Sequence, residues 1–355
     1  MTKRAAVLFA IAWGWLASPS AGQQRSATPD FRGVDEFWGI HDLLARDLEP
    51  NDEQWSALLS TPGYALVERN LGPVVREDLE IAFEPSRAKA RDRLRSGMSE
   101  RAMRVEHLLS AERERPSLAA LRDSLAAATP IADAVALAQR YLPPGATALA
   151  APPPVSFALF KDDAFASPHG IVVDLMNAHG GVLVPVLAHE FHHAFVYRLS
   201  PGAPADGMPG SLADVLYVMR NEGIADQIDK AYPFKAWTPG LDDYAARYNA
   251  EYARAPRTIA RLDSLLRTLD DDPWMDSSVT SHAQKLLWSS GHPVGAYIAR
   301  TILETFGPDS IYPGTRNPAA FLRTFAAAER ARGHADPFSP ATWRVIDAFE
   351  ARRWK

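Results

Sequence analysis

The sequence predicts an α+β fold that is mostly helical, with a small antiparallel sheet just before a central helix. Apolar residues recur at helical spacing through most of the chain. The exceptions are residues 155–160 (VSFALF) and 171–175 (IVVDL), which are rich in β-branched and aromatic side chains and follow proline and glycine. These two segments are the predicted strands, and the segment at about 184–199 is the predicted central helix.

Helical patterns occupy both flanks of the predicted strands. Residues 30–143 are expected to be helical, and the stretch 76–114, dense in arginine and glutamate, is expected to form a solvated helix surface. A proline-rich connection follows at 143–154. Helices are expected at about 184–199, 211–231, 242–269, 281–288, 293–306, 319–332 and 341–352.

The first residues are typical of a secretory signal peptide. Lys3 and Arg4 precede an apolar stretch at 5–17, which is short for a membrane span, and small residues follow. Cleavage after Ser20 and cleavage after Gly22 both fit the small-x-small rule, and an uncleaved anchor is the alternative. We therefore expect a secreted or periplasmic protein with no membrane association once the signal is removed.

The composition narrows the chemistry that the chain can perform. The 355 residues include no cysteine, so disulfides are excluded and any zinc site must use histidine and carboxylate ligands. The net charge of −5 gives no reason to expect a basic surface. Nucleic acid is therefore not an expected partner.

The central helix carries the pattern HExxH, as His189-Glu190-Phe191-His192-His193. Residues four apart lie on one face of a helix, so the imidazoles of His189 and His193 can bind one zinc ion. Glu190 lies about 100° further round the helix, where it can act as general base toward a water molecule on the metal. His192 points away from that face, and we expect it to be structural.

A third ligand is predicted in the following helix. Glu222 and Asp226 lie four residues apart in the segment NEGIAD (221–226), and Glu222 completes a ligand set of two histidines and a glutamate that leaves one position open for water. Asp226 is placed to accept a hydrogen bond from the far ring nitrogen of a ligand histidine. Ser211 is the expected N-cap of this helix, and Gly223 is small enough to let the helices of the site approach closely.

The pattern HExxH followed by NExxxD resembles the gluzincins, the metallopeptidase group that includes thermolysin. The segments HEFHH, NEGIAD and GHPVGAYIA (291–299) are similar, more closely, to zinc-dependent peptidase families within that group. This resemblance covers about 155–306. It implies one zinc ion per chain held by His189, His193 and Glu222, base catalysis by Glu190, and support of the ligands by Asp226.

Hydrolysis of an amide also needs a donor for the negative oxygen that develops on the carbonyl. His292 is expected at the start of a helix, and Tyr297 about one turn further on. Each is a candidate donor. The alternatives are that His292 caps the helix and that Tyr297 belongs to the core. The strand at 171–175 is either an edge strand that holds an extended substrate or a plain buried strand.

The sequence therefore predicts a secreted zinc metallohydrolase, a peptidase whose partners are peptide or protein substrates. Two other interpretations stay open: a non-catalytic binding protein that keeps metal on a peptidase scaffold, and a structural metal site that joins two helices. Glu190 and the open ligand position favour catalysis, because a structural site closes its coordination shell. The predicted divisions are a signal peptide at 1–22, an N-terminal helical region at 23–150, a zincin-like catalytic core at 151–306 and a C-terminal helical region at 307–355.

Overall fold

The computed structural model describes residues 28–97, 99–146, 151–199, 212–236, 241–269 and 277–353. The predicted signal peptide and the predicted N-cap Ser211 lie outside these residues. Within them most residues are helical and three short strands form one sheet, so the predicted α+β class is confirmed. Over this part of the chain, none of the helices combines the length and the apolar character that a membrane crossing requires.

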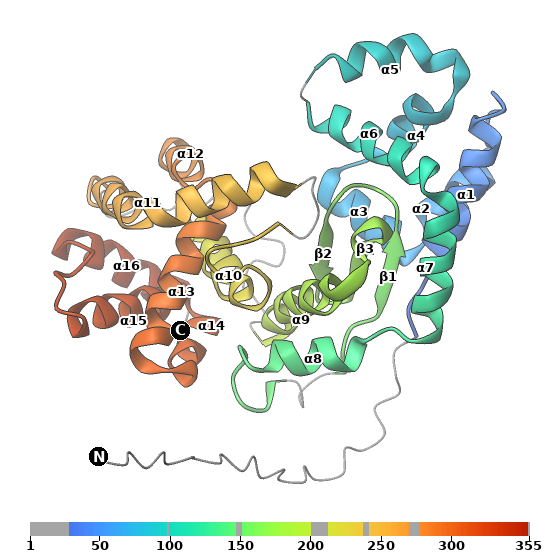
Figure 1. Cartoon of the computed structure of the whole chain (residues 1–355). Coiled ribbons are helices and arrows are strands. Elements are labelled where there is room, and N and C mark those ends of the chain that lie inside the picture. The colour runs from blue at the N-terminus through green and yellow to red at the C-terminus, as the bar shows by residue number, and fades with distance from the viewer. Residues whose placement is uncertain are drawn as a thin grey trace, which may run out of the picture.

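The chain runs from one group of helices, through the sheet, to a second group of helices, from right to left in Figure 1. Before the sheet come α1 (Arg32–Leu44), α2 (Asp52–Leu59), α3 (Pro62–Leu71), α4 (Val75–Phe83), α5 (Ala88–Arg95), α6 (Glu100–Arg113), α7 (Arg115–Ala127) and α8 (Ile131–Gln139). After it come α9 (Leu183–Leu199), α10 (Leu212–Asp229), α11 (Asp242–Leu266), α12 (Ser277–Leu286), α13 (His292–Phe306), α14 (Tyr312–Arg316), α15 (Pro318–Ala331) and α16 (Pro340–Arg353).

The sheet is mixed, and the prediction of an antiparallel sheet was wrong. Its strands are β1 (Val155–Ala158), β2 (Ala164–Ser167) and β3 (Gly170–Asp174), in the order β1-β3-β2. β3 is antiparallel to β2 but parallel to β1, with Val155 opposite Ile171. The prediction missed β2, which is four residues long. Because β2 reverses the chain between the two predicted strands, those strands point the same way.

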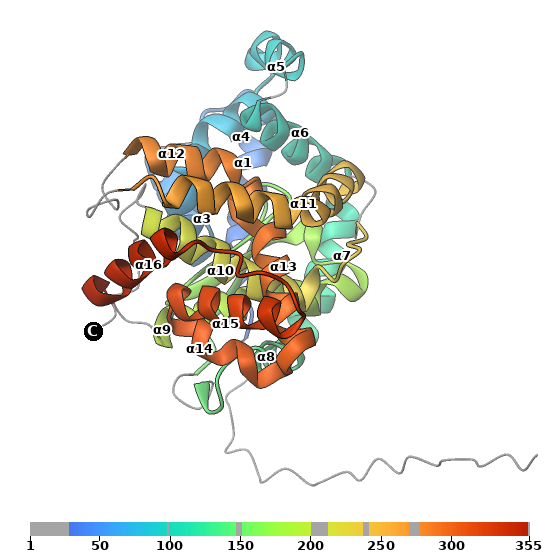
Figure 2. The ribbon, with the colours of Figure 1, turned by 90° about the vertical axis from the view of Figure 1, so that its left-hand side faces the viewer.

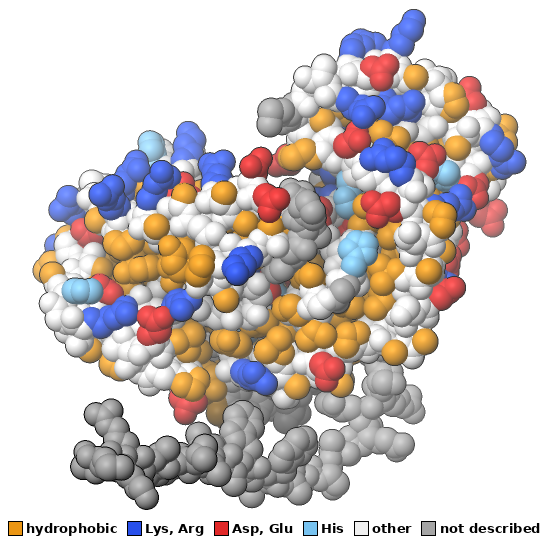
Figure 3. All heavy atoms as spheres, in the orientation of Figure 1, with side chains coloured by type: hydrophobic (Ala, Val, Ile, Leu, Met, Phe, Trp, Pro, Cys, Tyr) orange, Lys and Arg blue, Asp and Glu red, His pale blue; other side chains and the backbone are white. Residues whose placement is uncertain are grey.

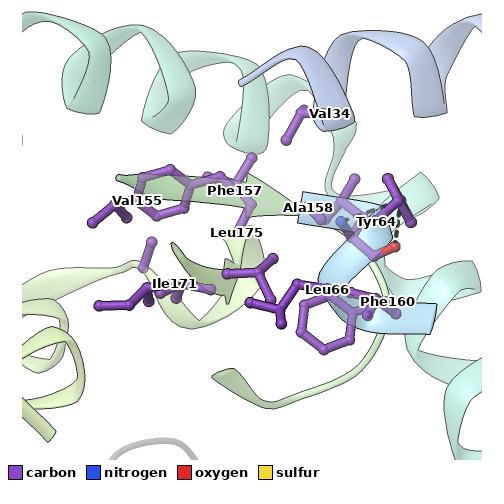
Figure 4. Packing of buried hydrophobic residues seen from close by; sticks show 14 of the residues in the cluster. Val34, Tyr64, Leu66, Val155, Phe157, Ala158, Phe160, Ile171 and Leu175 are labelled. Carbon is purple, nitrogen blue, oxygen red and sulfur yellow. Dashed lines mark hydrogen bonds between the residues drawn. The ribbon is translucent and has the colours of Figure 1, made fainter. Parts of the chain in front are cut away.

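The first hydrophobic core packs the N-terminal helices and α9 against this sheet. Figure 4 shows Tyr64 of α3 among the buried side chains of β1 and its neighbours. The hydroxyl of Tyr64 donates a hydrogen bond to the carbonyl of Leu159 at 2.7 Å. At the end of β3, the buried carboxylate of Asp174 accepts hydrogen bonds from Nε2 of His107 (3.0 Å) and from the N–H of Phe160 (2.7 Å). These bonds tie α3 and α6 to the sheet.

The second hydrophobic core is built by α10 to α16, with buried residues from Leu212 to Ile346. In Figure 2, α13 lies between α11 and α15. Helices α10 and α13 touch backbone to backbone, since a Cβ added to Gly223 would lie 2.2 Å from the carbonyl carbon of Gly295. The first core contains α9, which carries HExxH, and the second contains α10, which carries NExxxD. The two motifs therefore meet where the two cores meet. The predicted divisions at 151 and 307 stay predictions.

Candidate metal centre

Helix α9 directs two imidazoles toward α10. Apolar side chains such as Leu187, Phe191 and Phe195 bury other faces of α9 in the first core, and this burial fixes the orientation of the helix. His189 and His193 are one helical turn apart and point the same way. Their Nε2 atoms lie 2.9 Å from each other, and both side chains are buried.

Glu222 of α10 meets these two imidazoles. Its Oε2 lies 3.0 Å from Nε2 of His193 and 3.3 Å from Nε2 of His189. Atoms bound tetrahedrally to one zinc ion at about 2.0–2.1 Å lie roughly 3.3 Å from one another. The three donors, at 2.9–3.3 Å, come close to this spacing. Three lone-pair donors this close together also need a cation or protons between them. His189, His193 and Glu222 therefore form a group that can hold a metal ion.

Asp229, rather than Asp226, orients His189. Oδ1 of Asp229 accepts a hydrogen bond from Nδ1 of His189 at 2.9 Å, whereas Oδ1 of Asp226 lies 3.9 Å from that nitrogen. A proton on Nδ1 leaves the Nε2 lone pair free for a metal. The structure thus differs from the predicted contact of Asp226 with a ligand histidine. Asp229 follows Glu222 by seven residues, two helical turns, and this spacing is the sequence signal that could have identified it.

Asp226 instead contacts His292 at the start of α13. Both of its carboxylate oxygens lie 3.0 Å from Nδ1 of His292, and they also accept hydrogen bonds from Lys230 (2.8 Å) and from the hydroxyl of Tyr248 (3.0 Å). Burial raises the pKa of Asp226, but His292 and Lys230 outweigh it and hold that pKa well below its usual range. Nε2 of His292 faces the site, 3.4 Å from Oε2 of Glu222. Burial lowers the pKa of His292, but the carboxylates beside it raise that pKa above its usual value.

A cavity of about 760 Å³ opens in front of these groups. Glu190 lines it beside the three donors and is 8% exposed. Burial raises the pKa of Glu190, and the imidazoles of His189 and His193 offset this only in part. A general base works best when its pKa approaches the working pH, so this environment suits proton transfer. The cavity is also lined by Asn70, Asn177, His179, Tyr197, Tyr244, Ser289, Ser290 and His292.

The strand at the cavity is β2, not the segment 171–175. β3 lies in the middle of the sheet and Ile171 is buried, which corresponds to the plain buried strand of the two alternatives. Within the described part of the chain β2 pairs with β3 alone, so one of its edges is unpaired there. Ala164, Phe165 and Ala166 of β2 line the cavity.

Two aromatic residues of the sequence prediction lie away from the cavity. Tyr297 packs in the core, 5.7 Å from the ring of Tyr252 and 6.1 Å from the ring of Phe325, and it does not line the cavity. This placement corresponds to the core alternative for Tyr297. His192 is fully buried behind the donors, and burial lowers its pKa well below the usual value. Tyr197 and Tyr244 do line the cavity, although neither was singled out from the sequence.

The hydrogen bond from His189 to Asp229 gives a first prediction. Asp229→Asn should weaken zinc binding about 10- to 100-fold, because the amide cannot hold the proton on Nδ1 as a carboxylate does. Asp226→Asn should weaken zinc binding less, because its partner is His292 and not one of the three donors. Competition with a fluorescent zinc chelator measures the affinities. Equal zinc affinities for the two variants would show that Asp229 does not support the metal ligand His189 more than Asp226 does.

Comparisons with known proteins add a family to this geometry. A family model described as "Putative zinc dependent peptidase (DUF5700)" matches residues 55–332, which is more than half of the chain. The match takes in α9, α10 and α13 and therefore every residue of the candidate metal centre. A search of curated proteins and a search of solved structures found no match.

Proposed function

The chain belongs to this zinc-dependent peptidase family, and on that premise we propose that it is a gluzincin-type peptidase with one zinc ion held by His189, His193 and Glu222. The observation that carries the proposal is the convergence of three donor atoms, 2.9–3.3 Å from one another, at the wall of a cavity. Two of these donors come from α9 and one comes from α10. Their separations suit zinc, and the cavity gives a peptide access to the site.

The residues around the donors divide the chemistry of amide hydrolysis. Bound zinc would polarise the substrate carbonyl and make a water molecule acidic enough to be a nucleophile near neutral pH. Glu190 accepts the proton of that water and passes it to the nitrogen of the leaving amine. Nε2 of His292 donates a hydrogen bond to the carbonyl oxygen as negative charge develops there. Asp226 holds the His292 ring through Nδ1, so that Nε2 stays directed into the site.

One edge of β2 has no partner strand among the described residues, and it offers a place for the substrate backbone. An extended peptide can add to a sheet edge through main-chain hydrogen bonds, which hold it without regard to its side chains. We assign this role to Ala164–Ser167, because β2 is the strand that lines the cavity. The apolar segment at 5–17 supports export, and we place the activity in the secreted or periplasmic compartment.

A digest of a peptide library tests the proposed activity. Protein loaded with zinc should cleave internal or terminal peptide bonds, 1,10-phenanthroline should stop cleavage, and added zinc should restore it. Mass spectrometry of the products reports the cleavage positions and separates endopeptidase from exopeptidase action. Protein that binds one zinc ion but leaves every peptide intact would instead support the non-catalytic binding protein.

A further inference from the structure

A second hollow, of about 740 Å³, lies between α11 and α12. Its wall carries the side chains of four arginines, one lysine and one histidine: Arg247, Arg254, Arg257, Arg261, Lys285 and His282. Glu251 is the acidic side chain among the described residues of this wall. Figure 3 shows lysine and arginine side chains gathered over α11 and α12, at the upper left. We call this hollow the basic groove. It stands out because the whole chain has a net charge of −5.

The spacing of the arginines explains why they share the groove. Arg247, Arg254 and Arg261 recur every seven residues, about two helical turns, and so lie along one face of α11. All three are exposed. Arg254 forms an ion pair with Glu251 at 3.2 Å, and the guanidinium of Arg247 lies 4.8 Å from the ring of Trp288.

Other cations of the groove are available to a ligand. Within the described ranges, Arg257, Arg261 and Lys285 form no ion pair, and all three are exposed. Uncompensated positive charges that share one concave wall attract anions, and a cleft strengthens this attraction by focusing the field. The groove is therefore suited to a ligand that carries several negative charges.

The basic groove shares part of its wall with the cavity in front of His189, His193 and Glu222, which we call the metal cavity. Ser289 and Ser290 line both hollows. Their backbones are left-handed, with φ of 50° and 54°, and strained backbone of this kind tends to occur at functional sites. Two residues later the chain reaches His292 in the cavity. On α11, Tyr244 lines the cavity and Arg247, three residues further on, lines the groove. One extended ligand can therefore occupy both hollows.

We propose that the basic groove binds an acidic segment of the substrate polypeptide, while the scissile bond of that substrate lies in the metal cavity. The inference rests on the proposed peptidase function and adds a substrate class to it: polypeptides with clustered aspartate or glutamate a short distance from the cleavage site. An acidic segment is favoured over other polyanions because the shared wall makes the groove a continuation of the peptide-binding cavity. Opposite charge across a binding surface gives both specificity and faster association.

Paired substrates test this inference. Internally quenched peptides with one cleavage sequence carry either four glutamates or four glutamines, placed on one side or the other of the cleavage site. The wild-type protein should cleave the best-placed acidic peptide with a kcat/KM about tenfold higher than its glutamine twin, and 0.5 M NaCl should remove the difference. Arg257→Gln combined with Arg261→Gln should remove most of this preference and leave cleavage of the glutamine peptide within about twofold of wild type.

A matched variant controls for net charge. Arg140→Gln combined with Arg344→Gln removes the same charge from two exposed positions outside both hollows and should keep the preference. A wild-type protein without preference would overturn the proposal. Loss of preference in both double variants would overturn it as well, because a general charge effect would then be enough.

A binding measurement separates this proposal from the proposed activity. Fluorescence polarisation of a labelled four-glutamate peptide on the Glu190→Gln protein needs no turnover. Binding that weakens several-fold in Arg257→Gln/Arg261→Gln supports the groove even if no peptide is cleaved. If the wild-type protein cleaves glutamine peptides but the acidic peptide binds equally well to both proteins, the proposed peptidase activity stands. The proposed role of the basic groove is then overturned. Binding of a single-stranded oligonucleotide but not of the acidic peptide would also overturn it.

Discussion

Replacing Glu190 by glutamine should lower kcat for peptide hydrolysis about 10²- to 10⁴-fold while the zinc content stays near one ion per chain. Glutamine has nearly the same shape but cannot accept a proton from water. Glu190 also lies beside the donors without being one of them, so its loss leaves the metal ligands in place. Steady-state kinetics on a cleaved library peptide, with zinc content determined by elemental analysis, measure both quantities.

A glutamate elsewhere provides the control for this substitution. Glu304 is half exposed on α13, where it pairs with Arg300 at 2.7 Å, and it does not line the cavity. Glu304→Gln should keep kcat within about twofold of wild type, as expected of an exposed ion pair. A Glu190→Gln protein that cleaves peptides as fast as wild type would show that another group takes the proton.

Gly223→Ala should lower the free energy of unfolding by about 2–4 kcal/mol, because an added methyl group has no room between α10 and α13. Its Cβ would lie 2.2 Å from the carbonyl carbon and 2.5 Å from the oxygen of Gly295, and backbone atoms cannot move aside as a side chain does. The helices must therefore separate. Since α10 carries Glu222 and α13 carries His292, this separation should also lower kcat/KM of the protein that remains folded.

The same substitution at a different glycine isolates the clash. Gly39 is exposed on α1, and a Cβ added there meets no atom within 4 Å. Gly39→Ala should therefore stabilise the protein slightly, by about 0.5–1 kcal/mol, since alanine restricts the unfolded chain. Chemical denaturation of both variants gives the two free energies. A similar change for the two would mean that α10 and α13 do not pack as closely as described.

Local periodicity predicted most of the helices, because their patterns depend on residues a few positions apart. The expected helix at 184–199 is α9 (Leu183–Leu199), and the helix at 242–269 is α11 (Asp242–Leu266). The pairing of strands depends on distant segments and was predicted less well. β2 has four residues, two of them alanines and none of them β-branched, so its strand signal was too weak to predict a third strand. The parallel pairing of β1 with β3 was missed with it.

Spacing along one helix also predicted which candidate ligands lie on the same face. Contacts between different helices could be identified only in the structure. His189 and His193 share a face of α9 for reasons that are visible in the sequence. The partner of Asp226 depends on how α10 crosses α13, and that crossing directs Asp226 to His292 and leaves His189 to Asp229. The net charge is a sum over the whole chain and therefore did not predict the basic groove. The groove forms because side chains of α11 and α12 line one hollow.

The position of zinc in crystals would show whether His189, His193 and Glu222 are the metal ligands. Diffraction data collected above and below the zinc absorption edge should give one anomalous peak per chain, about 2.0–2.2 Å from Nε2 of His189, from Nε2 of His193 and from a carboxylate oxygen of Glu222. The peak should lie at the wall of the cavity with Glu190 beside it. A peak elsewhere, or zinc-soaked crystals with no peak between these three side chains, would contradict the assignment of this site as a zinc centre.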